Sequence, residues 1–312
     1  MIFSFNILHY KVGAIKDTFE CVDSILNLEY DNNIRVIIVD NGSKDQSYHL
    51  LTEKYGKYDY VEVLENKENL GFAKGNNVGY EYTVQKHNPD FLIIINNDTV
   101  ISQLNFLDLV SEEFKRSNFH ILGPKIITKT LVNQNPNGYL VKSLADVKRK
   151  IILKQKLLNE LDKTFSLYIF KIRLKSFIRD VPIVGKQILK LKRLLKSEPS
   201  TVIDKEIRQE NIQLHGSALI FSRLYTRLYD YAFYPKTFLF FEEDILFYIA
   251  NRDKLKIVYN PKIEIYHKED VSTDAVIKAE DKDRFKLKHS LDSLIVFKEL
   301  IEEDSRKEGE HS

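Results

Sequence analysis

Residues 35–42 read RVIIVDNG, an apolar and largely β-branched run that ends at once in polar turn residues. A continuous run of this kind is typical of a strand that is buried on both faces, as in a parallel sheet. The triplet Asp-Asn-Gly directly behind it is a turn signal. Ser43 and Gln46 then match the S-x-x-Q pattern of a helical capping box. The stretch therefore predicts a buried parallel strand, a polar loop and a helix, in that order.

The same alternation of strand and helix extends outward over residues 1–127. Short apolar runs predict strands, and apolar residues three or four apart predict helices. We expect strands over residues 2–8, 61–64, 91–95 and 121–127, and helices over 15–26, 74–84 and 106–114. The fold class is therefore α/β, with a mostly parallel central sheet flanked by helices. Ligands of such sheets bind beyond the carboxyl ends of the strands, where the polar stretches 40–43 and 96–99 lie.

The composition of the 312 residues limits the class of protein. Apolar residues make up 43% and charged residues 29%, which excludes wholesale disorder. The single cysteine, Cys21, excludes an intramolecular disulfide framework and a multi-cysteine zinc site. The longest unbroken apolar run, residues 91–95, is far shorter than the roughly 20 residues of a membrane span. Because residues 1–6 show no basic region before an apolar core, we expect a cytoplasmic protein.

Two carboxylates follow predicted strands and are candidate ligand contacts. Asp98 comes after the run 91–95 with amide neighbours, and one carboxylate in this setting suits Mg²⁺ when a diphosphate supplies the other ligands. Asp40 is placed to accept hydrogen bonds from a nucleobase imide or a ribose hydroxyl. In both places the alternative is ordinary turn chemistry, in which the side chain caps the next backbone segment.

A third candidate is the loop at residues 69–79, which reads NLGFAKGNNVG. Small residues allow a ligand to approach the backbone closely, and a helix N-terminus favours anions. Lys74 adds a positive charge for phosphate. The stretch is neither a Walker A loop nor G-x-G-x-x-G, so it does not indicate an NTPase or a dehydrogenase.

The fourth candidate is the stretch FLFFEEDIL at residues 238–246. Aromatic surroundings desolvate a carboxylate and raise its pKa, as a general base requires. The alternative is an acidic first turn of a helix, where carboxylates interact favourably with the helix dipole. His267, behind another apolar stretch, is a candidate metal or phosphate ligand, and its alternative is a structural role.

These motifs have a specific order along the chain: DNGSKD at 40–45, the 69–79 loop, NNDT at 96–99, HGSA at 215–218 and Glu243-Asp244. In that order they resemble the family 2 inverting glycosyltransferases with the GT-A fold, especially the bacterial rhamnosyltransferase-like branch. Asn251-Arg252 lies near the position where an arginine commonly follows in that family. The resemblance covers roughly residues 1–127 and 212–270.

The resemblance implies a reaction as well as a fold. A sugar would move from a UDP- or dTDP-sugar to a hydroxyl of a glycan or an undecaprenyl-linked oligosaccharide, with inversion at the anomeric carbon. Such transfers belong to bacterial capsule, exopolysaccharide or O-antigen synthesis. Asp244 would be the catalytic base, with Glu243 as the alternative. Mg²⁺ or Mn²⁺ would bind at Asp98, with His267 as a second ligand.

The remaining roles follow from the same resemblance. The acceptor side would include His215, Gly216 and Glu242. The nucleotide-sugar donor would contact nine residues, namely His9, Tyr10, Asp40, Asn41, Gly71, Lys74, Asn77, Asn97 and Asp98. We expect residues 1–127 to form the nucleotide-sugar half and residues 212–302 to form the acceptor and catalytic half. The latter ends in a helix over 282–301, and residues 303–312 would form a frayed tail.

Residues 128–211 are not explained by the resemblance, and we expect them to form a basic, mainly helical insertion. Within them, residues 148–196 contain 15 Lys and Arg against three acidic residues, interleaved with apolar ones such as Ile151 and Leu157. A basic amphipathic segment predicts peripheral binding to the anionic inner face of the plasma membrane. The alternatives are a solvated insertion and a homodimer contact. No nucleic-acid-binding motif accompanies the charge, so nucleic acid is not an expected partner.

Three classes of function therefore compete. The first is an active glycosyltransferase. The second is a catalytically inactive nucleotide-sugar-binding partner of a two-component transferase; Asn96, in place of an aspartate, keeps it open, whereas Glu243-Asp244 argues against it. The third is a sugar nucleotidyltransferase, which should carry a Gly-rich, Arg-containing loop after the first strand. Residues 8–13, LHYKVG, do not provide that loop.

Overall fold

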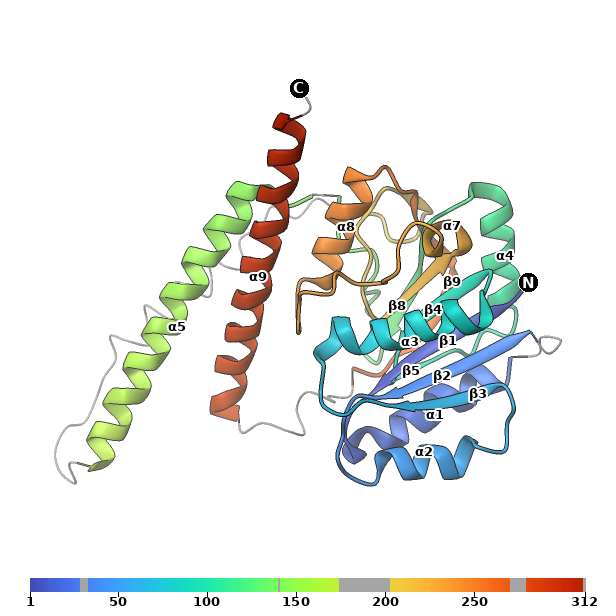
Figure 1. Cartoon of the computed structure of the whole chain (residues 1–312), viewed down its shortest axis with the longest axis horizontal. Helices are drawn as coiled ribbons and strands as arrows, with labels where there is room; N and C mark the ends of the chain where they lie inside the picture. The colour runs from blue at the N-terminus through green and yellow to red at the C-terminus, as the bar shows by residue number, and fades with distance from the viewer. Residues whose placement is uncertain (29–32, 140, 174–202, 270–278, 311–312) are drawn as a thin grey trace. The chain divides into compact units, whose positions relative to one another are not determined.

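The computed structural model describes residues 1–28, 33–139, 141–173, 203–269 and 279–310. The chain divides into two compact units (Figure 1). The sheet unit consists of Met1–Val141 and Ile203–Val276, and the helical unit consists of Lys142–Val202 and Ile277–Ser312. Each unit is described by itself below.

The first half of the sheet unit contains four parallel strands in the order β3-β2-β1-β4. Their bounds are Phe3–His9 for β1, Ile34–Asp40 for β2, Val61–Glu65 for β3 and Phe91–Asn96 for β4. The predicted strands are all present and parallel. Because parallel strands end at the same edge, their carboxyl ends form one side of a common site.

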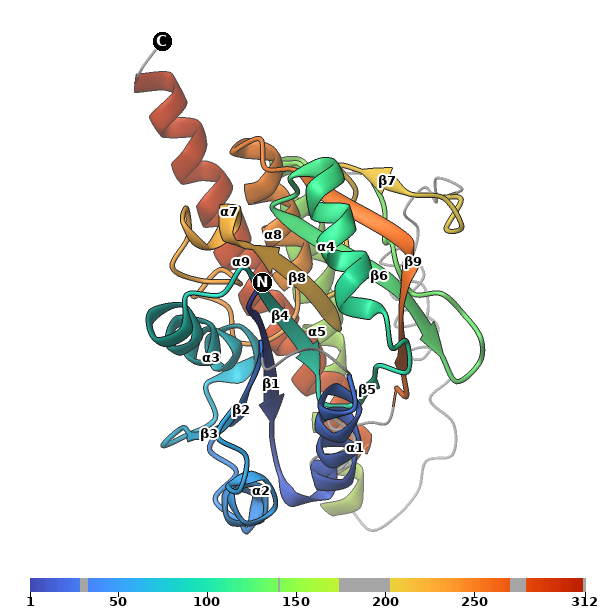
Figure 2. The same ribbon diagram turned by 90° about the vertical axis from the view of Figure 1, so that its right-hand side faces the viewer.

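The second half of the sheet brings a distant strand end to the same edge. Beyond β4 the order continues β8-β6-β9-β5, and β7 pairs with β9 (Figure 2). The bounds are Thr99–Val100 for β5, Ile121–Thr128 for β6, Gln209–Glu210 for β7, Ala218–Ser222 for β8 and Ile257–His267 for β9. Strand β8 is antiparallel to β4 and β6, whereas β9 is parallel to β6. At its end, His267 pairs with Thr99 and with Thr128.

Helices cover both faces of this sheet, which explains the continuous apolar runs. One core packs α1 (Ile15–Leu26), α2 (Ser47–Tyr55) and α4 (Phe106–Ser117) against residues such as Ile93 of β4. The other packs α3 (Gly71–His87) and α8 (Glu242–Arg252) against residues such as Ile94. Successive strand side chains point to opposite faces, so every residue of β4 except the last is buried. The α/β prediction with a mostly parallel sheet is confirmed. The short helices η1 (Val12–Ala14) and α7 (Arg223–Thr226) complete the unit.

The predicted capping box at Ser43 and Gln46 is wrong. Helix α2 begins at Ser47, and its N-cap residue Gln46 makes no side-chain capping bond. The hydroxyl of Ser43 instead donates to the buried carboxylate of Asp40. Asp45 takes over the capping, because its Oδ1 accepts from the backbone N–H of Ser47 at 2.9 Å. Two other local hydrogen bonds thus replace the one that the pattern predicts.

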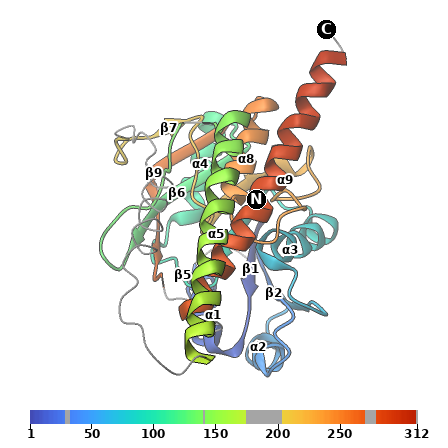
Figure 3. The same cartoon turned by 90° about the vertical axis from the view of Figure 1, so that its left-hand side faces the viewer.

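The helical unit pairs α5 (Leu144–Arg173) with α9 (Ala279–Glu310) in an antiparallel arrangement (Figure 3). Lys148 Nζ lies 2.9 Å from Glu302 near one end of the pair, and Arg284 lies 3.2 Å from Asp162 near the other. The C-terminal helix, which we expected to belong to the 212–302 half, clusters with the insertion. It also continues to Glu310, so the predicted frayed tail at 303–312 is helical in its described part. Ile301 and Asp304 are buried, so packing of the helix reaches the start of this segment.

Helix α5 is the part of the predicted insertion that the structure describes as a helix, and its apolar residues do not all face outward. Ile151 and Leu157, which we assigned to a membrane-facing side, are buried. The exposed face carries Arg149 and Lys156, with Ile152 as an apolar residue that is 51% exposed. Residues 174–196 of the predicted membrane segment lie outside the described residues. Within the described ranges, no helix combines the length and apolarity that crossing a bilayer requires.

Candidate functional site

The carboxyl edge of the parallel strands gathers most of the predicted site residues. His9 pairs in register with Asp40 across β1 and β2, and Leu8 pairs with Asn96 across β1 and β4. The backbone N–H of Asn41 donates to the carbonyl of His9 at 2.8 Å. The DNG turn after β2 and the NND turn after β4 therefore lie on either side of the end of β1, at the edge where ligands bind in this class of sheet.

Asp40 is a buried carboxylate that is held by its own loop. Ser43 Oγ donates to Asp40 Oδ1, and the backbone N–H of Lys11 donates to Ser43 Oγ at 2.8 Å. Lys11 Nζ also donates to the carbonyl of Ser43 at 2.6 Å, which joins the loops after β1 and β2. Burial raises the pKa of Asp40. Tyr10, half-buried beside this junction, remains at the rim of the site.

His9, at the carboxyl end of β1, lies against α1. Its ring is fully buried, and its Nδ1 is 2.7 Å from Thr18 Oγ1. Thr18 Oγ1 donates to the carbonyl of Ala14, so it accepts a hydrogen bond from the Nδ1–H of His9. Asn97 Nδ2 donates to the same hydroxyl at 3.0 Å. His9 and Asn97, both predicted donor contacts, therefore fasten α1 to the strand ends.

Buried His9 makes the stability of the fold depend on pH. Burial lowers the pKa of His9 from 6.5 to about 4. A lowered folded-state pKa means that the stabilisation is complete above pH 6.5 and is lost as pH falls toward 4. Between pH 7 and pH 5, we expect this residue to reduce the free energy of unfolding by about 2 kcal/mol. Urea unfolding at the two pH values measures the loss, and His9→Asn should make it smaller.

The exposed His49 of α2 provides the control for this prediction. His49→Asn should leave the difference between pH 7 and pH 5 unchanged. If His9→Asn loses as much stability as the unmodified chain over this interval, His9 is not the titrating group.

Two predicted donor contacts, Asn41 and Gly71, shape the loop at 66–71. Asn41 Oδ1 accepts from Asn66 Nδ2 and the N–H of Leu70, and its Nδ2 donates to the carbonyl of Gly71. Gly71 has a positive φ of 78°, and a Cβ there would meet the Phe238 carbonyl oxygen at 2.2 Å.

Asn77 has a similar structural use on α3. Its Oδ1 accepts from the backbone N–H groups of Ala232 and Phe233, and its Nδ2 donates to the carbonyl of Phe233 at 2.7 Å. The side chain therefore clamps the segment that leads to the acidic turn. Lys74, in contrast, is exposed in the first turn of α3.

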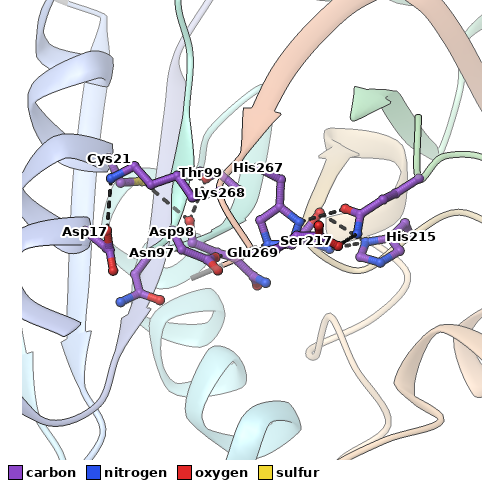
Figure 4. Close-up of polar contacts among 12 residues, drawn as sticks. Asp17, Cys21, Asn97, Asp98, Thr99, His215, Ser217, His267, Lys268 and Glu269 are labelled. Carbon is purple, nitrogen blue, oxygen red and sulfur yellow. Dashed lines mark hydrogen bonds and ion pairs between the residues drawn. The ribbon is translucent and has the colours of Figure 1, made fainter. Parts of the chain in front are cut away.

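The structure brings Asp98 and His267 together, although 169 residues separate them. Asp98 Oδ1 lies 3.2 Å from His267 Nε2, and both side chains are buried (Figure 4). Two hydrogen bonds of Lys268 hold the end of β9 beside this pair. The N–H of Lys268 donates to the carbonyl of Asp98 at 2.9 Å, and Lys268 Nζ binds Asp17 at 2.9 Å on α1. The pair is therefore a preformed arrangement of a carboxylate and an imidazole.

The predicted acceptor-side residues lie next to this pair. The ring centroids of His215 and His267 are 6.1 Å apart. The backbone N–H of Ser217 donates to His215 Nδ1 at 3.2 Å, so the proton of the neutral ring is on Nε2. Burial lowers the pKa of His215 to about 4, which keeps the ring neutral near pH 7. The N–H of Gly216 donates to Glu243 Oε1 at 3.1 Å, which connects this strand to the acidic turn.

The three consecutive acids form the first turn of α8. Glu242 is buried, and its Oε1 has no hydrogen-bond partner within the described part of the chain. Burial raises the pKa of Glu242 to about 8 and also raises the pKa of Glu243. Asp244 is half-buried. Phe240 and Phe241 precede the turn with positive φ angles of 74° and 68°, a backbone conformation that is costly for such residues and recurs at functional sites.

Two site residues were missed because they lie in the segment that we assigned to the insertion. Gln134 Oε1 is 2.7 Å from His267 Nδ1, and Asn135 Oδ1 accepts from the N–H of His215 at 3.0 Å. The structure places residues 128–141 in the sheet unit, so the start of the predicted insertion at 128 is too early. The signal was the polar run NQNPN at 133–137, directly after β6.

A sheet of this order, with acidic and histidine side chains at the carboxyl edge, defines a GT-A type of nucleotide-sugar fold. Residues 15–174, just over half of the chain, match the family model described as Glycosyl transferase family 2. The chain therefore belongs to glycosyl transferase family 2. The finer assignment to the rhamnosyltransferase-like branch stays a prediction.

Solved structures and a curated relative agree with this family. The Staphylococcus aureus TarS 1–349 structure matches with a TM-score of 0.50 at 15% identity, over 86% of this chain and 60% of that one. GalNAc-T7 with UDP, GalNAc and Mn²⁺ matches with a TM-score of 0.54 at 12% identity, over 86% and 44%. The low-salt glycan biosynthesis hexosyltransferase Agl10 of Haloferax volcanii is 23% identical over 112 residues, 35% of this chain and 34% of that protein. At these identities the structural likeness establishes the fold.

Proposed function

We propose that the chain is an inverting glycosyltransferase that moves a sugar from a nucleoside diphosphate donor to an acceptor hydroxyl. The observation that carries this proposal is the meeting, at one sheet edge, of the Asp98–His267 pair and the acidic turn of α8. The link between them is short, since His215 faces His267 and the next residue, Gly216, binds Glu243. Sugar transfer needs a binding site for the donor diphosphate and, close to it, a base for the acceptor hydroxyl.

The donor nucleotide is the first part of the proposal. Asp40 accepts the imide N–H of uracil or thymine, which supports a UDP- or dTDP-sugar, and Tyr10 lies at the rim for the base. Lys74 and the N-terminus of α3 favour the diphosphate. TarS and GalNAc-T7 have both been solved with UDP, and both share this fold.

Asp98 and His267 fit a divalent cation, which is the second part of the proposal. A carboxylate oxygen and an imidazole nitrogen face each other at 3.2 Å; the carboxylate suits Mn²⁺ and Mg²⁺, and the imidazole, a transition-metal ligand, favours Mn²⁺ of the two. The described residues hold no group of three or more His, Cys, Asp and Glu that would enclose a metal. Asp98 and His267 would thus hold the cation while diphosphate oxygens and water complete its shell. A bound cation neutralises charge on the departing diphosphate.

The acidic turn supplies the proton transfer. Asp244 takes the proton of the acceptor hydroxyl as its oxygen attacks the anomeric carbon from the face opposite the diphosphate. The new carbon–oxygen bond forms as the carbon–oxygen bond to phosphate breaks, and the electron pair leaves with the nucleoside diphosphate. One displacement inverts the anomeric centre. Glu243, held by the N–H of Gly216, fixes the first turn of α8 instead of reacting.

The acceptor and its location complete the proposal. The acceptor is a glycan or an undecaprenyl-linked oligosaccharide of bacterial capsule, exopolysaccharide or O-antigen synthesis. A lipid-linked acceptor places the enzyme on the inner face of the plasma membrane, and exposed Arg149 and Lys156 of α5 support contact with anionic lipid. The alternative, an inactive nucleotide-sugar-binding partner, would have no use for the acidic turn beside the Asp98–His267 pair.

Donor hydrolysis tests the function. A panel of UDP-, dTDP- and GDP-sugars is incubated with Mg²⁺ or Mn²⁺, and release of the nucleoside diphosphate is measured. We expect turnover of a UDP- or dTDP-sugar, and we expect Asp40→Asn to raise its KM by about 10-fold, because a neutral amide oxygen replaces a charged hydrogen-bond acceptor.

The exposed Asp108 of α4 provides the matched control, so Asp108→Asn should leave KM unchanged. Turnover of GDP-sugars alone would contradict the choice of a UDP- or dTDP-sugar, and an unchanged KM in Asp40→Asn would contradict the donor contact at Asp40. Binding of a donor without hydrolysis or transfer under any condition would favour the inactive partner.

A further inference from the structure

Gln134 lies between His267 and Glu269 in a chain of hydrogen bonds that ends at Asp98. Gln134 Oε1 is 2.7 Å from His267 Nδ1, and Gln134 Nε2 donates to Glu269 Oε1 at 2.7 Å. On the far side of the imidazole, Nε2 faces Asp98 at 3.2 Å. We propose that Gln134 is a positioning residue that fixes the ring orientation and the tautomer of His267 for cation binding. This inference rests on the proposed function.

The positions of the protons follow from the order of the groups. A carboxylate only accepts hydrogen bonds, so the amide nitrogen of Gln134 faces Glu269 and its oxygen faces His267. A ring that binds a cation through Nε2 must then carry its proton on Nδ1, with the lone pair of Nε2 on the side of Asp98 Oδ1. Two acceptors that face each other at 3.2 Å repel one another, and a cation between them removes the repulsion.

Without Gln134 the same ring has a competing arrangement. The proton would move to Nε2 and donate to Asp98, which closes the pair as a hydrogen bond and leaves no lone pair for a cation. Histidine ligands in metalloproteins commonly donate their other N–H to an oxygen acceptor, and loss of that acceptor lowers metal affinity by about 10- to 100-fold.

The backbone around Gln134 is anchored well enough to impose this orientation. The N–H of Gln134 donates to the carbonyl of Ile126 on β6 at 2.9 Å. Asn133 Oδ1 accepts from the N–H groups of Ile126 and Asn135, and Asn133 Nδ2 donates to Tyr259 OH at 2.9 Å on β9. These neighbours fix the position from which the Gln134 side chain reaches His267.

Gln134→Met tests the proposal, because Met has nearly the same length but offers no amide. Binding of Mn²⁺ to the full chain with UDP is followed by electron paramagnetic resonance. We expect Gln134→Met to weaken Mn²⁺ binding by about 10- to 100-fold. The ¹⁵N shifts of His267 without metal should change from the Nδ1–H to the Nε2–H tautomer. The swap Gln134→Glu with Glu269→Gln keeps an acceptor at His267 and should restore most of the affinity.

Gln103→Met is the matched control, since the Gln103 side chain also binds β9. It donates to the carbonyl of Lys262 and accepts from the N–H of Glu264, which is three residues before His267. The control should keep the affinity and the tautomer of the unmodified chain. Equal losses in both variants would overturn the positioning role, and so would an unchanged His267 tautomer in Gln134→Met. If the unmodified chain and His267→Ala bind Mn²⁺ equally, the proposed metal site fails, while the tautomer measurement still decides the role of Gln134.

Discussion

Asp98→Ala is expected to reduce metal-supported donor turnover by about 10³-fold, and EDTA is expected to do the same to the unmodified chain. The departing diphosphate gains negative charge, and a cation at this point contributes several kcal/mol of stabilisation to the transition state. Each 1.4 kcal/mol corresponds to about a factor of ten in rate. The measurement is nucleoside diphosphate release with Mg²⁺ or Mn²⁺, after EDTA, and after the cation is restored.

Asp59→Ala serves as the control for Asp98→Ala, because Asp59 is an exposed carboxylate before β3. It should retain full turnover. The turnover of His267→Ala should lie between those of Asp98→Ala and Asp59→Ala, since this variant keeps the Asp98 carboxylate. Undiminished turnover in EDTA would contradict the metal role of Asp98 and His267, although the fold and the assignment of the acidic turn would stand.

The sheet and the location of its site follow from local patterns in the sequence. The run at 36–39 is β-branched and apolar because both faces of β2 are covered, and the polar residues behind it mark the edge where the strands end. His267 was a candidate metal ligand on its type alone, and the structure confirms that it lies beside Asp98. Parallel strands make such meetings predictable, since their ends share one edge.

The hydrogen-bond partners of the site residues do not follow from local patterns. Asn41 was predicted to contact the donor, but its amide holds the 66–71 loop. Gln134 lies 133 residues from His267, and no periodicity connects the two. Amide side chains donate and accept equally well, so the packing of distant segments decides which role each one takes. The end of α9 could not be predicted from the sequence for a similar reason, because tertiary packing contributes more to the stability of a helix than local propensity does.

Asp244→Asn is expected to lower kcat for transfer by about 10²- to 10⁴-fold, while the affinity for the donor hardly changes. Asparagine has nearly the same shape as aspartate, so the first turn of α8 should persist. Asparagine cannot accept the proton of the acceptor hydroxyl. Because this proton moves only in the transition state, its loss should lower kcat and leave the affinity for the donor nearly unchanged. The measurement is steady-state transfer, together with donor binding by calorimetry.

Glu243→Gln separates the base from its neighbour. Glu243 Oε1 accepts from the N–H of Gly216, and a glutamine oxygen can accept the same bond. A Cβ at position 216 would lie 2.6 Å from Glu243 Oε1, which shows how closely this carboxylate is fitted against the strand. A group held in this way is suited to positioning, so we expect Glu243→Gln to reduce kcat much less than Asp244→Asn does. The reverse order, with Asp244→Asn active and Glu243→Gln inactive, would move the base one residue earlier. In that case the raised pKa of Glu243 would belong to the proton acceptor itself, and the bond from Gly216 would orient the base.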